Sequence, residues 1–329
     1  MDTQRVRVVD LHCDTLDRLA RGGEFAPPGQ DASIDAPPAS LRSNSAHVSL
    51  DLMRNFDWCQ CFAVFIPDTL QGADAWRFYQ EVRAYFMSQL QAQGDLLAQV
   101  RDASSIEVAF ASRRTAALLT IEGGSFLEDA PEAIERIGQI ADDGVKMLTL
   151  TWNAQNALAS GSAATGGLTR FGERVTGMLE ERRIIVDVSH LNDESFFDLA
   201  RVATRPFVAS HSNSRAICDH PRNLTDDQFR LICERGGIVG LNFFNEFLTT
   251  EKRDAAPDDV LRHLDRWLSL GGEKTVALGS DYDGADIALW LTPCDKVAAL
   301  HAQVTRAFGA QIADDLFFNN ARRFFSTAL

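Results

Sequence analysis

Short apolar runs that end on a side chain able to bind a metal ion recur along the chain. Five of them are VVDLHCD, LLTIEGG, IIVDVSH, PFVASH and VALGSD. Apolar runs of this length, rich in β-branched residues, predict buried strands. The candidate ligands therefore fall at the carboxyl ends of predicted strands, and they are His12, Asp14, Glu122, His190, His211 and Asp281.

Eight strands are predicted, with helical segments between them. The strands cover residues 5–12, 59–67, 115–122, 145–151, 183–189, 206–210, 236–244 and 275–281. Apolar positions three or four residues apart predict helices at about 73–94, 131–143, 171–183, 226–236 and 258–272. This alternation favours a parallel sheet. An open sheet would gather its site at one switch point, so candidate ligands on strands all round favour an α/β fold of the (β/α)8 TIM barrel type.

We expect one barrel domain over residues 1–329, interrupted by an irregular insert at about residues 21–50. The insert contains FAPPGQDASIDAPPAS, which holds four of the ten prolines together with Gly, Ser and Asp. This composition predicts a loop rather than a linker between domains. Because the loop follows the first strand, we expect it to overhang the site.

The overall composition restricts the partners of the protein. A net charge of -14 argues against binding to nucleic acid or to an anionic membrane, and favours a small-molecule partner. The start of the chain lacks the pattern of a secretion signal, and no apolar run is long enough to span a bilayer. The six cysteines lack paired CxxC spacing, so reduced thiols and a cytoplasmic location are expected.

The candidate ligands indicate a metal centre only when they are taken together. His12 and Asp14 can point to one centre because alternate residues of a strand face the same way. Alone, the pair fits a buried histidine hydrogen-bonded to a helix-capping aspartate equally well. Glu122 precedes Gly123 and Gly124, which would leave its carboxylate free to bridge two cations.

Mixed histidine and carboxylate ligands suit zinc, although manganese, cobalt or iron would fit the same geometry. We expect His12 and Asp14 on one ion, His190 and His211 on the other, and Glu122 between them. A metal-bound hydroxide that attacks a carbonyl needs a base to take its proton and an acid for the leaving amine. We assign both tasks to Asp281, with Asp283 as the competing candidate, because strand alternation does not distinguish the two.

The chain resembles the membrane dipeptidase (renal dipeptidase) family, peptidase family M19, of the amidohydrolase superfamily. The resemblance spans most of the chain and rests on DLHCDT, IEGG, LTLTWNAQN, DVSH, SHSNSRAICDHPRNLTDDQ, GGIVGLNFF and GSDYDG. It implies a barrel of the metal-dependent hydrolase type with two Zn²⁺ ions per chain on the five ligands above. It also implies that Arg222 holds the C-terminal carboxylate of the substrate, and it suggests a homodimer.

Two residues depart from the family pattern. Trp152 stands where well-studied mammalian members have a histidine that contacts the substrate, and Phe244 stands where the animal enzymes have a tyrosine. The Trp152 indole could donate a hydrogen bond or form an apolar wall, and Asn153 and Asn156 are candidate substitutes for the histidine. The lipid-anchored location of the animal enzymes is not implied, because the end of the sequence has no long apolar tail.

The sequence is compatible with three functions. The first is a zinc dipeptidase that cleaves dipeptides, including those with a C-terminal D-residue, by attack of metal-bound hydroxide. The second is an amidohydrolase acting on N-acyl amino acids, lactams or a specialised metabolite conjugate. The third is a metal-containing binding protein that has lost catalysis through the changes at Trp152 and Phe244.

Overall fold

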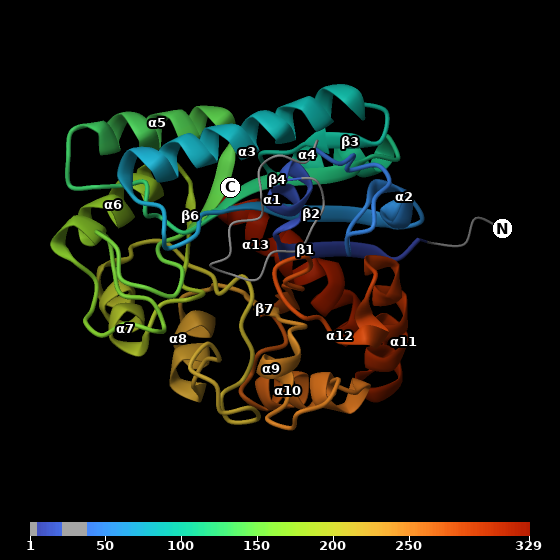
Figure 1. Ribbon diagram of the computed structural model, residues 1–329. Helices are drawn as coiled ribbons and strands as arrows, with labels where there is room; N and C mark the ends of the chain where they lie inside the picture. Colours follow the sequence, from blue (N-terminus) through green and yellow to red (C-terminus); the bar gives the residue numbers. More distant parts are fainter. Residues whose placement is uncertain (1–4, 22–37) are drawn as a thin grey trace.

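The computed structural model describes residues 5–21 and 38–329, and it has a ring of parallel strands surrounded by helices (Figure 1). The strands of the ring are β1 (Arg7–Cys13), β2 (Asp57–Phe65), β4 (Thr115–Glu122), β5 (Val145–Thr149), β6 (Ile185–Asp187), β7 (Val239–Leu241) and β8 (Val276–Leu278). They pair in the order β6-β5-β4-β2-β1-β8-β7, and every pairing is parallel. The predicted α/β barrel type is confirmed.

The ring closes between β6 and β7 through the segment predicted as the sixth strand. This segment forms only two single parallel bridges, Asp187 with Val208 and Ala209 with Val239. One strand was not predicted: β3 (Leu97–Gln99) pairs with the beginning of β4, outside the ring. Its three residues are too short for an alternating pattern to identify.

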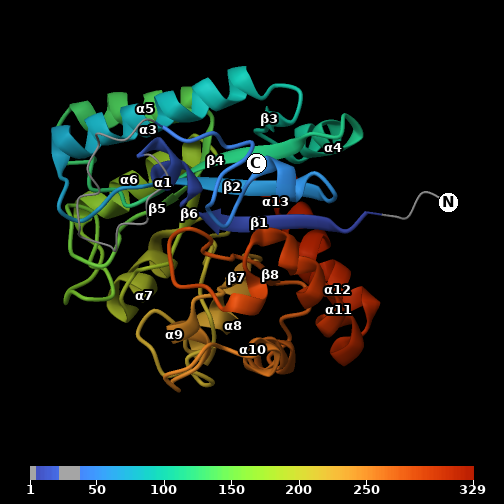
Figure 2. The ribbon, with the colours of Figure 1, turned by 45° about the vertical axis from the view of Figure 1, so that its right-hand side comes forward.

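Helices cover the outside of the ring. The five predicted helices correspond to α3 (Gly72–Ala92), α5 (Glu132–Asp143), α6 (Arg170–Glu181), α8 (Asp226–Glu234) and α10 (Pro257–Ser269). Capping residues explain several of their ends: the Thr225 hydroxyl accepts the Gln228 N–H at the start of α8, and Gly144 ends α5 with φ +87°. Figure 2 shows α3 and α5 side by side on one side of the barrel, with α10, α11 and α12 on the opposite side.

The remaining helices connect these elements or follow the last strand. They are α1 (Thr15–Ala20), α2 (Leu50–Met53), α4 (Ala103–Ala111), α7 (Asp193–Val202), α9 (Asn245–Leu248), α11 (Val297–Phe308), α12 (Ala310–Asp314) and α13 (Asn320–Ala328). Within residues 5–21 and 38–329, none of the helices combines the length and the apolar character that a bilayer span requires.

The two ends of the barrel differ. Phe318 and Phe324, near and within α13, belong to one buried cluster with Val9, Ala116 and Ile185, which lie toward the amino ends of their strands. The C-terminal helices therefore cover the amino ends of the strands. The carboxyl ends remain for the site, as in other α/β barrels.

The predicted insert is described only in part, because residues 22–37 lie outside the described residues. Its last part returns to the carboxyl end of the barrel. There the His47 backbone N–H donates to Asp283 Oδ1 over 2.7 Å, and the Asp283 N–H donates to His47 Nδ1 over 3.0 Å. These bonds place His47 against Asp283, which follows Asp281 by two residues in the chain, so the described end of the insert lies beside the candidate site.

Candidate metal centre

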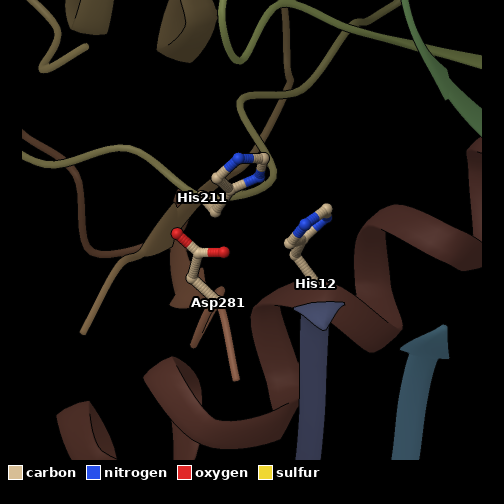
Figure 3. A group of neighbouring side chains, drawn as sticks. All are labelled: His12, His211 and Asp281. Carbon is tan, nitrogen blue, oxygen red and sulfur yellow. The ribbon is translucent and has the colours of Figure 1, made fainter. Parts of the chain in front are cut away.

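The barrel brings all six candidate ligands into one buried cluster. His12 lies near the end of β1, Asp14 directly precedes α1 without a side-chain capping bond, and Glu122 is the last residue of β4. The other three follow strands or bridges. Ligand atoms lie within 4.8 Å of one another in three overlapping groups: His12, His211 and Asp281; Glu122, His190 and His211; His12, Asp14 and Glu122. Figure 3 shows the first group, in which the His12 and His211 rings stack with centroids 3.9 Å apart.

Glu122 lies between the histidines, as expected of a shared ligand. Its Oε1 is 2.6 Å from His190 Nε2 and 3.6 Å from His211 Nε2, while its Oε2 is 3.2 Å from His12 Nε2. His12 Nε2 also lies 3.5 Å from Asp14 Oδ1. The two carboxylate oxygens of Glu122 therefore face different histidines.

Hydrogen bonds on the outer side of two histidines determine which ring nitrogen carries the proton. His190 Nδ1 lies 2.9 Å from Asn153 Oδ1, which can only accept, so His190 Nδ1 is the donor. His211 Nδ1 lies 2.7 Å from Ser210 Oγ, whose own proton goes to Asp187 over 2.5 Å. In the neutral rings both Nε2 atoms are then left with lone pairs.

These two lone pairs make the cluster fit a cation. His190 Nε2 and His211 Nε2 are 3.0 Å apart, and both face Glu122. Lone pairs and a carboxylate at this separation repel one another unless a positive ion lies among them. His12 Nε2 and Asp14 Oδ1 are buried and have no hydrogen-bond partner among the described residues, so they too are available to an ion.

Burial and mutual charge shift the pKa values of the cluster. Burial lowers the pKa of His190 to about 4 and lowers that of His211 well below its usual value, so both rings are neutral, as metal ligands must be. Burial also acts against charged His12, but the carboxylates of Asp14 and Glu122 outweigh it and raise the His12 pKa. Positive charge is therefore favoured at this point of the cluster.

The structure distinguishes Asp281 from its competitor Asp283. Asp281 belongs to the cluster, and its Oδ2 accepts from Asn242 Nδ2 over 2.9 Å. Burial raises the Asp281 pKa, so this carboxyl binds a proton more readily than an exposed aspartate. Asp283 instead accepts from Thr15 Oγ1 at 2.6 Å and Arg18 Nη1 at 2.9 Å. Asp283 thus holds α1 and the segment around His47 in place.

Arg222 is a buried cation with unused donors. Its side chain lies over the Phe247 ring, with Cζ 5.4 Å from the centroid. Nε and Nη2 are buried without a hydrogen-bond partner among the described residues. Burial lowers its pKa to about 10, and the charges of Glu122 and Asp281 act on it as well, so it lies close to the cluster. A buried guanidinium with free donors is suited to binding a carboxylate.

The remaining predicted residues surround the cluster. The Trp152 ring lies 6.1 Å from the His190 ring and 5.1 Å from the Phe65 ring, centroid to centroid, and is partly exposed. Phe244 contacts Phe247, the ring beneath Arg222, at 4.8 Å. Asn153 lies behind His190 and is bonded to it. Asn156 accepts from the backbone of Leu158 and donates to Leu150, so it shapes the loop.

Three polar residues next to the cluster were not identified from the sequence: Asp187, Ser210 and Asn242. Each interrupts an apolar run or directly precedes a candidate ligand, and this position was the available signal. Asn242 donates to Asp281, Ser210 contacts His211 Nδ1, and Asp187 accepts the hydroxyl of Ser210. An α/β barrel with histidines and carboxylates gathered at its strand ends defines a class, the metal-binding barrel proteins.

The chain belongs to the membrane dipeptidase family, peptidase family M19, whose sequence profile matches residues 3–328. The resemblance inferred from the motifs is therefore confirmed. In sequence, the chain is 43% identical over 152 residues to the Klebsiella pneumoniae protein described as the uncharacterized protein in the pqqA 5′ region. It is 32% identical over 166 residues to the Acinetobacter calcoaceticus protein described as the uncharacterized protein in the PQQ-III 3′ region.

These matches cover 43% and 47% of this chain, and the chain spans about half the length of the two relatives, 56% and 52%.

Two solved structures match this chain over nearly its whole length. The structure described as the dipeptidase AC, a metallopeptidase of family M19, has a TM-score of 0.85 and 25% identity, with 99% of both chains covered. A Rhodobacter sphaeroides metallopeptidase, bound to a phosphinate mimic of L-Ala-D-Ala, has the same fold with a TM-score of 0.86 at 24% identity and 99% and 100% coverage.

Proposed function

We propose that this protein is a zinc-dependent dipeptidase that hydrolyses the peptide bond of dipeptides, including those with a C-terminal D-residue. One observation carries the proposal: a buried cluster of residues that could hold a metal ion lies close to Arg222, whose Nε and Nη2 have no hydrogen-bond partner among the described residues. Membership of the M19 family supports peptide hydrolysis. The L-Ala-D-Ala mimic bound to the Rhodobacter protein supports the inclusion of D-residues.

Each group in the cluster has a proposed task. His12 and Asp14 would hold one zinc ion, His190 and His211 the other, and Glu122 both. Zinc, when bound, polarises a carbonyl and lowers the pKa of water. Asp281, held by Asn242, would take the proton of the attacking water and return it to the leaving amine.

Arg222 would select the substrate by its free C-terminal carboxylate. Two donors of a planar guanidinium match two carboxylate oxygens, and burial strengthens the pair. Held at that end, the dipeptide would present its peptide bond to the cluster, with Trp152 and Phe65 as an aromatic wall on the His190 side. Binding would therefore fix orientation as well as affinity.

We also propose that the substrate is a free small molecule, that the protein acts in the cytoplasm, and that it forms a homodimer. The net charge of -14 is unfavourable for nucleic acid or anionic membranes. All six cysteines are unpaired, which is consistent with a reducing compartment.

The test is hydrolysis of a dipeptide library by chelator-stripped protein before and after zinc is restored. The library includes L,D pairs, C-terminal amides and N-acyl amino acids. We expect zinc to restore cleavage of dipeptides with a free carboxylate and amides to be poor substrates. If N-acyl amino acids or lactams outrank every dipeptide, the protein is a different amidohydrolase. Zinc-loaded protein inert toward the whole panel would instead indicate a binding protein.

A further inference from the structure

Asp187 is a fully buried acceptor at the end of β6. Its Oδ1 accepts from the backbone N–H groups of Ser189 and Ser210, both over 2.9 Å. Its Oδ2 accepts from Thr149 Oγ1 over 2.8 Å and from Ser210 Oγ over 2.5 Å. Four donors from three different segments thus fix this carboxylate, and none of these contacts reaches the ligand cluster directly.

The direction of the hydrogen bonds along Asp187, Ser210 and His211 follows from this arrangement. The carboxylate has no proton to give, so the Ser210 hydroxyl must donate to it. Ser210 Oγ then has only acceptor capacity left for His211 Nδ1, 2.7 Å away. His211 therefore carries its proton on Nδ1, and its Nε2 lone pair faces Glu122 and His190.

We propose that Ser210 and Asp187 are positioning residues that fix the tautomer of His211. We call the two hydrogen bonds from His211 Nδ1 to Ser210 and from Ser210 to Asp187 the relay. Without the relay the His211 proton could move to Nε2, where it would point into the cluster and block an ion. The inference rests on the proposed metal centre, since the tautomer matters only if Nε2 is a ligand. Outer contacts of this kind raise metal affinity by fixing the ring before the ion arrives.

A second buried Asp–Ser pair, Asp10 with Ser280, provides a matched control for the pair of Asp187 with Ser210. Buried Asp10 in β1 accepts from the backbone N–H of Ser280 over 2.8 Å and from its hydroxyl over 2.6 Å. Ser280 precedes Asp281 as Ser210 precedes His211. The Ser280 hydroxyl, however, lies near the His12 backbone carbonyl and not near an imidazole nitrogen. A substitution at Asp10 or Ser280 therefore alters the same kind of buried pair, but one that does not contact His211.

The decisive variant is Asp187→Asn, which keeps the shape of the side chain. Its oxygen would still accept the two backbone N–H groups, so its NH2 would face Ser210 and donate to it. Ser210 would then donate to His211 Nδ1 and leave the proton on Nε2. We expect long-range ¹H–¹⁵N spectra of metal-free, histidine-labelled protein to show His211 change from the Nδ1–H to the Nε2–H form. Zinc affinity, measured by chelator competition, should fall at least about 10-fold.

Asp10→Asn should leave the His211 spectrum unchanged. If Asp187→Asn does not fold, Ser210→Ala provides the same test, because His211 then loses its outer acceptor and should populate both tautomers. A His211 that stays in the Nδ1–H form in the folded variants would overturn the proposal. The spectra need neither metal nor activity, so a protein that proves not to be a dipeptidase can still confirm or refute the relay.

Discussion

Arg222 shows how a single side chain can set substrate choice. Its buried donors have no partner among the described residues, so a substrate carboxylate would gain a charge-assisted pair that water does not screen. We expect Arg222→Lys to lower kcat/KM for free dipeptides about 100-fold, equivalent to about 3 kcal/mol, because one ammonium cannot bind both oxygens. Steady-state kinetics on a dipeptide and its C-terminal amide would test this.

The kinetics need a control in the same loop. Arg215 binds Asp193 through both terminal nitrogens, at 2.8 and 2.9 Å, near the surface. Arg215→Lys should leave the ratio of free to amidated substrate unchanged. An Arg222→Lys protein that keeps the wild-type preference for free dipeptides would remove Arg222 from substrate recognition.

Asp281 carries the proposed proton transfer, and an isosteric change isolates it. Asp281→Asn should retain zinc, because the other five residues still supply ligands, but should lose at least about 100-fold in kcat. Metal analysis and kcat on the same preparation would separate the roles: lost zinc would identify Asp281 as a necessary ligand, and an unchanged kcat would refute the shuttle. Asp283→Asn, which disturbs the bonds to Arg18 and Thr15, should mainly lower stability.

His263 links stability to pH away from the cluster. Its Nδ1 accepts from the Ser214 N–H and its Nε2 donates to the Leu248 carbonyl, both over 3.0 Å, and burial lowers its pKa to about 4. The folded state therefore disfavours protonation. The stabilisation is present above the unfolded pKa of about 6.5 and is lost as pH falls toward 4, by about 2 kcal/mol at pH 5.

Urea unfolding of chelator-treated protein at pH 8 and pH 5 would measure this loss. His263→Gln can supply one acceptor and one donor and does not titrate, so its stability should fall by about 2 kcal/mol less over the same interval. Equal losses in both proteins would show that His263 does not control the acid sensitivity.

At the level of elements, the backbone of β7 and the backbone just after β8 pack so closely against the Ser210 carbonyl that only glycine fits at Gly240 and Gly279. A Cβ on Gly240 would lie 1.9 Å from the Ser210 carbonyl oxygen, and a Cβ on Gly279 would lie 1.8 Å from it. Backbone cannot yield as a flexible side chain can. We expect Gly240→Ala to lower stability by about 3 kcal/mol or more, with a fall of several degrees in Tm.

The same substitution elsewhere should have the opposite sign. Gly177 lies in α6, and a Cβ there would meet nothing within 4 Å among the described residues. Gly177→Ala should raise stability by about 1 kcal/mol through helix propensity. Calorimetry on both variants would compare them, and equal Tm values would contradict the close approach at Gly240.

The elements also show what the sequence could and could not specify. The position of the candidate ligands at strand ends was predictable, because each one ends an apolar run and that local pattern survives in the fold. The choice between Asp281 and Asp283 was not predictable. Both residues adopt positive φ, +64° and +68°, so the alternation of side chains along a strand does not extend to them. The role of Asp187 was not predictable either, because it depends on which residues lie opposite β6. These are Val208 and Ser210, and their position is set by the register between two segments.

At the scale of the whole molecule, the proposed ligands connect distant parts of the chain. They extend from residue 12 in β1 to residue 281 after β8, and Glu122 belongs to two of the three ligand groups. Bound ions would thus join strands around the ring, whereas without them buried carboxylates face one another. Metal binding should stabilise the folded protein as a unit rather than one loop.

Restoring zinc to chelator-stripped protein at about 100 times its Kd should therefore add about 2.7 kcal/mol for each occupied site. Scanning calorimetry should show one transition moving to higher temperature by several degrees. Glu122→Ala removes the shared ligand, so its shift on adding zinc should largely vanish, while Glu173→Ala on the exposed side of α6 should keep it. Comparing loaded with stripped protein within each variant cancels the direct effect of the substitution on folding. A full zinc shift in Glu122→Ala would mean that the ions bind elsewhere, and the centre proposed here would be wrong.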